Sequence, residues 1–317
     1  MRQEHPKTVV GFIGLGVMGM PMARNLLKVG YPVVALDVLP DKAAELAEAG
    51  ASIAESPAAV ARAADLVVTM LTDAPVVEQV LFGPASVSEG SRPGQIVIDA
   101  STISPIATRS MAARLAELGV MLLDAPVSGG QKGAADGTLS FMVGGDFATF
   151  ERCLPIFEAM GSRITWIGES GAGQIAKACN QSIIAVSLVG ISEALLLAAR
   201  SGVDPARVRE ALLGGFAGSL LLEVQGKRML DRTFEPGFRA ALHYKDLGIA
   251  RSLAQSVQSP APATGLALDL FGSLLARGSG NLDHSAIVTS LEALAGSAVA
   301  LPEPARPQNL RRRRAAK

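Results

Sequence analysis

Short apolar runs alternate with alanine-rich stretches of helical period along the first half of the chain. The apolar runs lie at residues 8–13, 32–36, 66–70, 95–99, 120–124, 139–143 and 163–167, and each has the length of a buried strand. Strands that alternate with helices predict a parallel sheet wound with helices. Asp136-Gly137, which precedes the sixth run, predicts a hairpin turn.

The second half of the chain has a different pattern. From Gln174 to about Val299, helical periods are interrupted by glycine and proline, and little strand pattern remains. A continuous helix from Gln174 to Arg200 would extend roughly 40 Å at 1.5 Å per residue, enough to join two domains. We therefore expect an α/β domain at 1–170, an all-α domain at 171–300 joined through this long helix, and a disordered tail at 301–317, which is proline-rich and then basic.

A glycine turn connects the first apolar run to the helix that follows it. The turn reads Gly14-Leu15-Gly16-Val17-Met18-Gly19. In a strand, glycine turn and helix of this kind, Gly14 permits the tight turn, Gly16 lets a pyrophosphate approach the backbone, and Gly19 lets the helix pack on the strand. The helix N-terminus also attracts phosphates. We therefore predict that these six residues bind a dinucleotide in a Rossmann-type domain.

An acidic residue ends the second apolar run. Asp37 lies about 20 residues beyond the glycine turn, where a carboxylate binds the ribose hydroxyls of a dinucleotide. The same carboxylate would repel a 2′-phosphate, and Val38-Leu39-Pro40 offers no arginine to hold one. The expected cofactor is therefore NAD(H) rather than NADP.

A loop suited to an anion follows the fifth apolar run. Ser128 offers a hydroxyl, and Gly129 and Gly130 expose backbone N–H groups that could hold a carboxylate. The loop would lie at the carboxyl end of a strand, where ligands bind in open α/β sheets. A plain turn is the alternative interpretation.

A lysine stands near the start of the long apolar helix. A helix N-terminus repels a cation, and burial penalises the ammonium form, so both effects would lower the pKa of Lys177 and make it a proton donor. Asn180 and Gln181 share its helix face. The alternative is a solvated surface lysine. Together, the dinucleotide turn, the anion-binding loop and this lysine suit the reduction of a small carbonyl compound that carries a carboxylate.

Charge and composition exclude several classes of protein. Lys plus Arg and Asp plus Glu both number 29, so no global field favours nucleic acid or an anionic membrane. Two cysteines form no disulfide framework, and the three histidines, His5, His243 and His284, are scattered along the sequence, so no metal site is expected.

Two segments bear on location. Residues 1–7 lack the apolar core of a signal peptide, which makes the cytoplasm the expected compartment. The apolar segment from Ile183 to Ala199 contains Ser187, Ser192 and Glu193 and falls short of the roughly 20 apolar residues that a membrane span needs. We expect a buried core helix.

Four motifs resemble the β-hydroxyacid dehydrogenase family, which includes 3-hydroxyisobutyrate dehydrogenase, tartronate semialdehyde reductase and, more distantly, 6-phosphogluconate dehydrogenase. In family order they are Gly11–Gly19, Asp124–Gly130, Gly137–Gly145 and Gly171–Gln181, and the resemblance extends over about residues 8 to 297. Further stretches are similar to the branch that reduces tartronate semialdehyde: Gly214–Ser219, Asp231–Arg239, Leu242–Leu247 and Asp283–Ala286.

The resemblance implies a role for several residues on the substrate side. Lys177 would be the general acid in reduction and the general base in the reverse reaction. Ser128, Gly129 and Gly130 would hold the substrate carboxylate, and Asn180 or Gln181 would hydrogen-bond the substrate or the lysine. Gln181 departs from the asparagine of many relatives.

The resemblance also implies roles on the cofactor side. Thr102 would lie beside the nicotinamide riboside, Leu71 and Thr72 would belong to the nicotinamide-side loop, and Lys245 would close over the cofactor. Thr72 departs from the proline or serine of relatives, and for Lys245 a surface ion pair with Asp246 is the alternative. Of the remaining polar residues, His243 is expected to pack or to cap a helix rather than to catalyse. Asp283 and His284 are expected either to cap a helix or to lie at a subunit contact.

The activity that the resemblance implies is NAD-dependent reduction of tartronate semialdehyde to glycerate. Oxidation of 3-hydroxyisobutyrate is the neighbouring alternative, and a non-catalytic module that recruits a partner through Arg311–Arg314 is an alternative of another class.

The helix from Gln174 to Arg200 is apolar on nearly every face, so we expect a homodimer or homotetramer, with no nucleic acid or membrane partner.

Overall fold

A computed structural model describes residues 8–299 of the chain. These residues form two compact units: unit 1 comprises 8–183 with 245–264, and unit 2 comprises 184–244 with 265–299. The expected domain limits at 170 and 300 stay predictions. The N-terminal segment 1–7, with His5, and the expected disordered tail with Arg311–Arg314 lie outside the described residues.

Unit 1 is built on a nine-stranded sheet in the order β3-β2-β1-β4-β5-β6-β8-β7, with β9 paired to β8. The strands are β1 (Val10–Ile13), β2 (Val33–Leu36), β3 (Ser52–Ile53), β4 (Leu66–Thr69), β5 (Ile96–Asp99), β6 (Met121–Asp124), β7 (Val127–Ser128), β8 (Leu139–Gly144) and β9 (Gly161–Gly168). The first six pair in parallel, as the alternating pattern predicts. The Rossmann-type fold is thereby confirmed.

The far edge of the sheet corrects two expectations. Strand β8 runs antiparallel to both β6 and β7, because the chain between β7 and β8 contains only the seven-residue helix α7 (Gly130–Asp136), which is shorter than a parallel crossover. Gly137 is the left-handed C-cap of α7, at φ 67°, so Asp136-Gly137 is not a hairpin turn.

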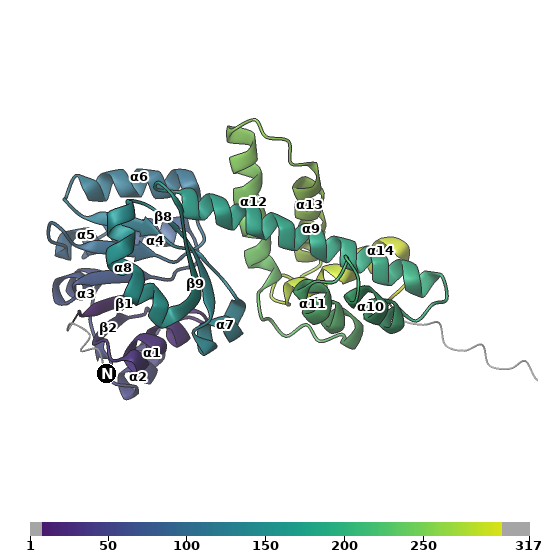
Figure 1. Cartoon of the computed structure of the whole chain (residues 1–317), viewed down its shortest axis with the longest axis horizontal. Coiled ribbons are helices and arrows are strands. Elements are labelled where there is room, and N and C mark those ends of the chain that lie inside the picture. The colour runs from purple at the N-terminus through teal and green to yellow at the C-terminus, as the bar shows by residue number, and fades with distance from the viewer. Residues whose placement is uncertain (1–7, 300–317) are drawn as a thin grey trace, which may run out of the picture. The chain divides into compact units, whose positions relative to one another are not determined.

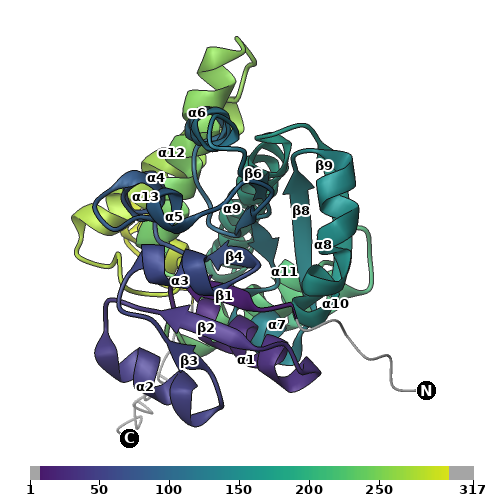
Figure 2. The same cartoon turned by 90° about the vertical axis from the view of Figure 1, so that its left-hand side faces the viewer.

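Helices cover both faces of the sheet (Figure 2). Side chains of α1 and α8 pack with Phe12 and Val68 on one face, and those of α3, α4 and α6 pack with Val67 and Val97 on the other. The helices are α1 (Gly19–Val29), α2 (Pro40–Glu48), α3 (Pro57–Ala63), α4 (Ala74–Phe82), α5 (Val87–Gly90), α6 (Pro105–Ala116) and α8 (Phe147–Met160). Strands buried on both faces explain the continuous apolar runs of the sequence.

Unit 2 consists of helices (Figure 1). They are the second part of α9 (Ala172–Arg200), α10 (Pro205–Leu213), α11 (Leu220–Asp231), the first turn of α12 (Ala240–Ser256), α13 (Pro262–Ala276), the 3₁₀ turn η1 (His284–Ile287) and α14 (Val288–Ala295). Apart from an isolated bridge between Arg239 and Asp283, the described part of this unit contains no strand. The all-α prediction and the continuous long helix are confirmed.

Helix α9 passes from unit 1 into unit 2 without a break. By length and composition alone it is long enough and apolar enough to cross a membrane, which corrects the expectation that this segment is too short. Half of its most apolar window is buried inside the structure, and Lys177 and Gln181 lie buried in its first turns. These are features of a core helix.

Two histidines of unit 2 lie side by side. Although far apart in sequence, His243 and His284 are in contact, with 3.1 Å between their Nδ1 atoms, and both pack against Phe238. Asp283 caps η1 by accepting the Ser285 N–H at 3.1 Å, which favours the cap interpretation. Among residues 8–299, no group of three or more His, Cys, Asp or Glu side chains could hold a metal ion.

Candidate active site

The glycine turn between β1 and α1 leaves its backbone open to a ligand. A Cβ at Gly14 would lie 2.4 Å from the Met70 carbonyl oxygen, and one at Gly19 would lie 1.9 Å from the Gly14 carbonyl oxygen. A Cβ at Gly16 would meet nothing within 4 Å. Gly14 and Gly19 therefore allow close packing of the turn, and Gly16 leaves space where a pyrophosphate could approach.

Asp37 follows β2 and is fixed beside this turn. Its Oδ2 accepts the Leu15 N–H at 2.5 Å, and its Oδ1 accepts the Leu39 N–H at 2.8 Å. A cavity of about 310 Å³ adjoins it, lined by Leu15, Gly16, Val17, Met20, Pro21, Asp37, Leu39, Lys42 and Gln131. Val17 is exposed there and Met18 is half-buried. A carboxylate and an open glycine backbone around one cavity fit the ribose and phosphates of a dinucleotide.

The start of α9 is anchored to the sheet by Asp124, which ends β6. One oxygen of this buried carboxylate accepts the Gly171 N–H at 2.7 Å and the other accepts the Gln174 N–H at 2.9 Å. The Gln174 side chain in turn donates to the Ser101 carbonyl at 2.8 Å and accepts the Ile103 N–H at 3.1 Å. These contacts fix the first turn of the helix at the carboxyl ends of the strands.

Lys177 is 7% exposed, and its ammonium donates to the Val127 carbonyl at 2.8 Å. Burial lowers the pKa of this amine to about 8; Asp246 opposes the fall and Lys245 adds to it. The interpretation as a solvated surface lysine is therefore wrong. An amine with this pKa can give and accept a proton near neutral pH.

The predicted anion loop lies beside this lysine. Ser128 is half-buried at the end of β7, directly after the carbonyl that Lys177 contacts. Gly129 has φ 135° and Gly130 has φ 61°, conformations that side chains rarely adopt. The glycines therefore allow the sharp path of the chain, and the structure brings the lysine and the loop together.

The two amides after Lys177 have different environments. Asn180 is half-buried and donates to the Gln181 Oε1 at 2.8 Å. Gln181 is buried and donates through its Nε2 to the Asp246 Oδ2 at 2.7 Å. The Gln181 side chain is thus directed to a carboxylate of α12.

Lys245 connects α12 to two loops of the sheet. Its ammonium donates to the Thr72 carbonyl at 2.9 Å and to the Thr102 carbonyl at 2.6 Å. It also lies 3.2 Å from the Asp246 Oδ1, an oxygen with no aligned hydrogen bond within the described structure, so that contact is one of charge. The ion pair predicted as an alternative therefore exists, but its carboxylate is buried. The Leu71 N–H donates to the Ser101 hydroxyl at 2.9 Å, which ties the same two loops together.

Sequence reasoning did not predict the burial of three carboxylates, Asp99, Asp124 and Asp246. Asp99 and Asp124 end adjacent strands, a position that could have marked them, and burial raises the pKa of Asp99 to about 6. Asp99 holds the loop of Ser101 by accepting its N–H at 3.1 Å. Burial likewise raises the pKa of Asp246, against the opposing charges of Lys245 and Lys177.

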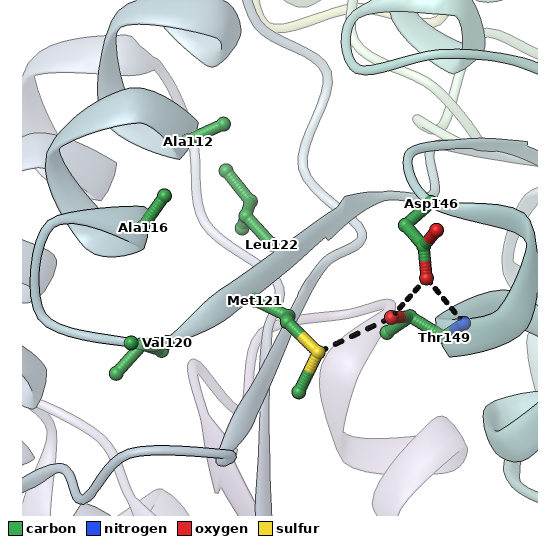
Figure 3. Close-up of a pocket in the computed structure, with 8 residues that line it drawn as sticks. Ala112, Ala116, Val120, Met121, Leu122, Asp146 and Thr149 are labelled. Atoms are coloured by element: carbon green, nitrogen blue, oxygen red, sulfur yellow. Dashed lines mark hydrogen bonds between the residues drawn. The ribbon is translucent and has the colours of Figure 1, made fainter.

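A second cavity, of about 320 Å³, lies at the start of β6, between α6 and α8 (Figure 3). Alanine and other apolar side chains form most of its wall. Its carboxylate, Asp146, accepts the Thr149 N–H at 2.8 Å and caps α8. The cavity beside the glycine turn therefore remains the candidate cofactor site.

Known families match both parts of the chain. Residues 9–168 match the family described as the NAD binding domain of 6-phosphogluconate dehydrogenase. Residues 171–291 match the family described as NAD-binding of NADP-dependent 3-hydroxyisobutyrate dehydrogenase. Nearly the whole described chain is thus accounted for by two consecutive families of one class of enzyme.

Individual proteins agree with these matches. The 2-hydroxy-3-oxopropionate reductase of Escherichia coli is 48% identical over 291 residues, which cover 92% of this chain and 99% of that protein. The NAD-dependent L-serine dehydrogenase of Pseudomonas aeruginosa is 40% identical, with 88% and 96% covered. A solved structure of 3-hydroxyisobutyrate dehydrogenase from Mycobacterium tuberculosis with L-serine has a TM-score of 0.82 at 36% identity, with 90% and 99% covered. The chain belongs to the 3-hydroxyisobutyrate dehydrogenase-like family of β-hydroxyacid dehydrogenases and is an oxidoreductase.

Proposed function

We propose that the chain reduces tartronate semialdehyde to glycerate with NADH, and that Lys177 supplies the proton. The observation that carries the proposal is a buried lysine with a pKa of about 8 beside the Ser128–Gly130 loop, in a chain 48% identical to a 2-hydroxy-3-oxopropionate reductase. The glycine turn and Asp37 supply the cofactor site.

NADH, when bound, supplies a hydride to the aldehyde carbon. The Lys177 ammonium gives a proton to the aldehyde oxygen, so that the carbonyl becomes an alcohol, and the neutral amine then recovers a proton from solvent. Ser128 and the N–H groups of Gly129 and Gly130 hold the substrate carboxylate. The carbonyl of Val127, which accepts from Lys177, keeps the ammonium at this loop.

Asn180 is the amide that we assign to the substrate. The Nε2 of Gln181 donates to Asp246, whereas Asn180 is half-buried and lies one helical turn beyond Lys177. Gln181 orients Asn180, because the Gln181 Oε1 accepts a hydrogen bond from the Asn180 Nδ2 at 2.8 Å. On the cofactor side, Lys245 holds the carbonyls of Thr72 and Thr102 and so fixes the loops assigned to the nicotinamide riboside.

The substrate is tested by comparing kcat/KM for three compounds: tartronate semialdehyde with NADH, and 3-hydroxyisobutyrate and L-serine with NAD. Tartronate semialdehyde, 3-hydroxyisobutyrate and L-serine differ at the carbon next to the carboxylate by a hydroxyl, a methyl or an ammonium group. A pocket that hydrogen-bonds one of these groups discriminates strongly against analogues that lack it. The two alternatives are compared because relatives carry those names. A higher kcat/KM for either would replace the proposed substrate.

Asp37→Ala is expected to weaken NADH binding and to reduce the preference of the protein for NADH over NADPH. The change removes the ribose acceptor and the negative charge that repels a 2′-phosphate. Titrations of both cofactors against the two proteins measure the effect. An unchanged ratio of the two dissociation constants would show that Asp37 does not contact the ribose.

The reaction should show opposite pH dependence in its two directions. Because burial lowers the Lys177 pKa to about 8, the ammonium needed for reduction is lost as pH rises through that value, and the amine needed for oxidation appears. We expect kcat for reduction to fall above about pH 8 and kcat for oxidation to rise over the same range. Steady-state rates from pH 6 to 10 check this. If kcat fell above pH 8 in both directions, or rose in both, the assignment of Lys177 would be contradicted.

We further propose that the chain forms a homo-oligomer. On α9, Ile183 is 66% exposed and Leu197 is 68% exposed, and in unit 2 Phe216 and Leu220 are exposed as well. Apolar surface of this kind favours association, most often about a two-fold axis. Light scattering at micromolar concentration should give at least twice 32.7 kDa, and a monomer mass would contradict the proposal.

A further inference from the structure

Three charged side chains meet beside the cavity that Asp37 adjoins. Glu45 accepts a hydrogen bond from Lys42 through its Oε2 and another from Arg24 through its Oε1, each at 3.0 Å. Lys42 lines the cavity together with Asp37. The hydrogen bond from Lys42 and the charge of Lys42, with a smaller contribution from the charge of Arg24, lower the pKa of Glu45, so its carboxylate is ionised and can pair with both cations.

The position of this cluster bears on a phosphate attached to the ribose. The Asp37 carboxylate cannot turn away from the cavity without losing hydrogen bonds from the N–H groups of Leu15 and Leu39. A 2′-phosphate beside Asp37 would therefore need cations to offset that charge. Lys42 lies on the same cavity wall, and Arg24 is joined to it through Glu45. The chain thus holds one candidate cation on this wall, Lys42, and a second, Arg24, that shares its glutamate partner.

We propose that Glu45 is a specificity-determining residue: by pairing with Lys42 and Arg24 it prevents them from neutralising a 2′-phosphate, and so adds to the discrimination that Asp37 exerts against NADPH. The inference rests on the proposed function only in placing the adenosine ribose at Asp37. A chain without an arginine after β2 still contains basic side chains close by, and their pairing decides whether they favour the phosphorylated cofactor.

The expected size of the effect follows from the exposure of the pairs. The side chains of Arg24, Lys42 and Glu45 are 40–47% exposed, and interactions between exposed charges are modest and are screened by salt. We expect Glu45→Gln to tighten the binding of a 2′-phosphate by roughly threefold to tenfold at low ionic strength. The gain should shrink in about 1 M salt, where the screening length falls to about 3 Å.

The experiment measures binding of cofactor fragments and so does not depend on turnover. Calorimetric titrations compare adenosine 2′,5′-bisphosphate with 5′-AMP, which differ at the 2′ position. Glu45→Gln should tighten the binding of the bisphosphate and leave the binding of 5′-AMP unchanged. Glu48→Gln is the matched control, because Glu48 is an exposed glutamate of the same helix that forms no ion pair with residues 8–299. The control should leave both dissociation constants unchanged.

Removing the cations identifies the cause. In the Glu45→Gln background, Lys42→Gln together with Arg24→Gln should abolish the gain in bisphosphate affinity. A gain that survives this change, an equal gain in Glu48→Gln, or no gain in Glu45→Gln would each overturn the inference. Failure of the proposed cofactor preference would look different: the unaltered protein would bind NADPH more tightly than NADH, whatever the effect of Glu45.

Discussion

Lys177→Ala is expected to reduce kcat for reduction by roughly 10²–10⁴-fold, the usual contribution of a positioned acid or base. The buried ammonium is directed to the loop assigned to the substrate carboxylate, and its lowered pKa matches a group that must lose and recover a proton in each cycle. The affinity for NADH should change little, because the glycine turn connects β1 to α1 and Asp37 follows β2, so neither belongs to α9.

The measurement is a pair of steady-state assays with a titration of NADH on the same protein samples. Lys28→Ala, which removes an exposed lysine of α1, is the matched control and should keep normal turnover. If Lys177→Ala retained near-normal kcat, the assigned proton donor would be wrong. If it lost NADH affinity as well, the substitution would have disturbed the anchoring of α9, and the loss of turnover could not be assigned to proton transfer.

Local patterns were sufficient to predict the strands that are buried on both faces of the sheet. Such strands appear in sequence as continuous apolar runs, and each of the seven runs contains a strand, although β9 is exposed or half-buried along most of its length. Strands β3 and β7 were missed because each has two residues, too few for a pattern. Gly137 was misassigned because Asp-Gly suits both a hairpin turn and a left-handed helix C-cap.

Contacts between distant residues could not be predicted in the same way. Lys177 was found from its place in a helix, but the carboxylate that affects its pKa, Asp246, lies far along the chain on another helix. The contact between His243 and His284 joins residues 41 apart for the same reason. Periodicity places a residue on a face of its own element, whereas the partner across a contact depends on tertiary packing.

Asp246 lies where its charge influences both lysines of the site. It accepts from Gln181 at 2.7 Å, lies 3.2 Å from the Lys245 ammonium, and its charge raises the pKa of Lys177 against the effect of burial. Asn has nearly the same shape as Asp and can still accept the hydrogen bond from Gln181. Asp246→Asn therefore removes the charge of this residue while it leaves the hydrogen bond that orients Gln181.

Asp246→Asn is expected to move the alkaline limb of the reduction profile to lower pH. Without the carboxylate, burial and the charge of Lys245 are no longer opposed, so the Lys177 pKa falls below its present value of about 8 and less of the amine is protonated at a given pH. A fall of one unit in this pKa would reduce kcat for reduction at pH 8 by about fivefold, and the loss should nearly vanish at pH 6. Asp65→Asn, which removes an exposed carboxylate paired with Arg92, should leave the profile unchanged. A uniform loss of kcat at every pH, with the limb in its original place, would show that Asp246 supports the fold of the site but does not set the charge of its lysine.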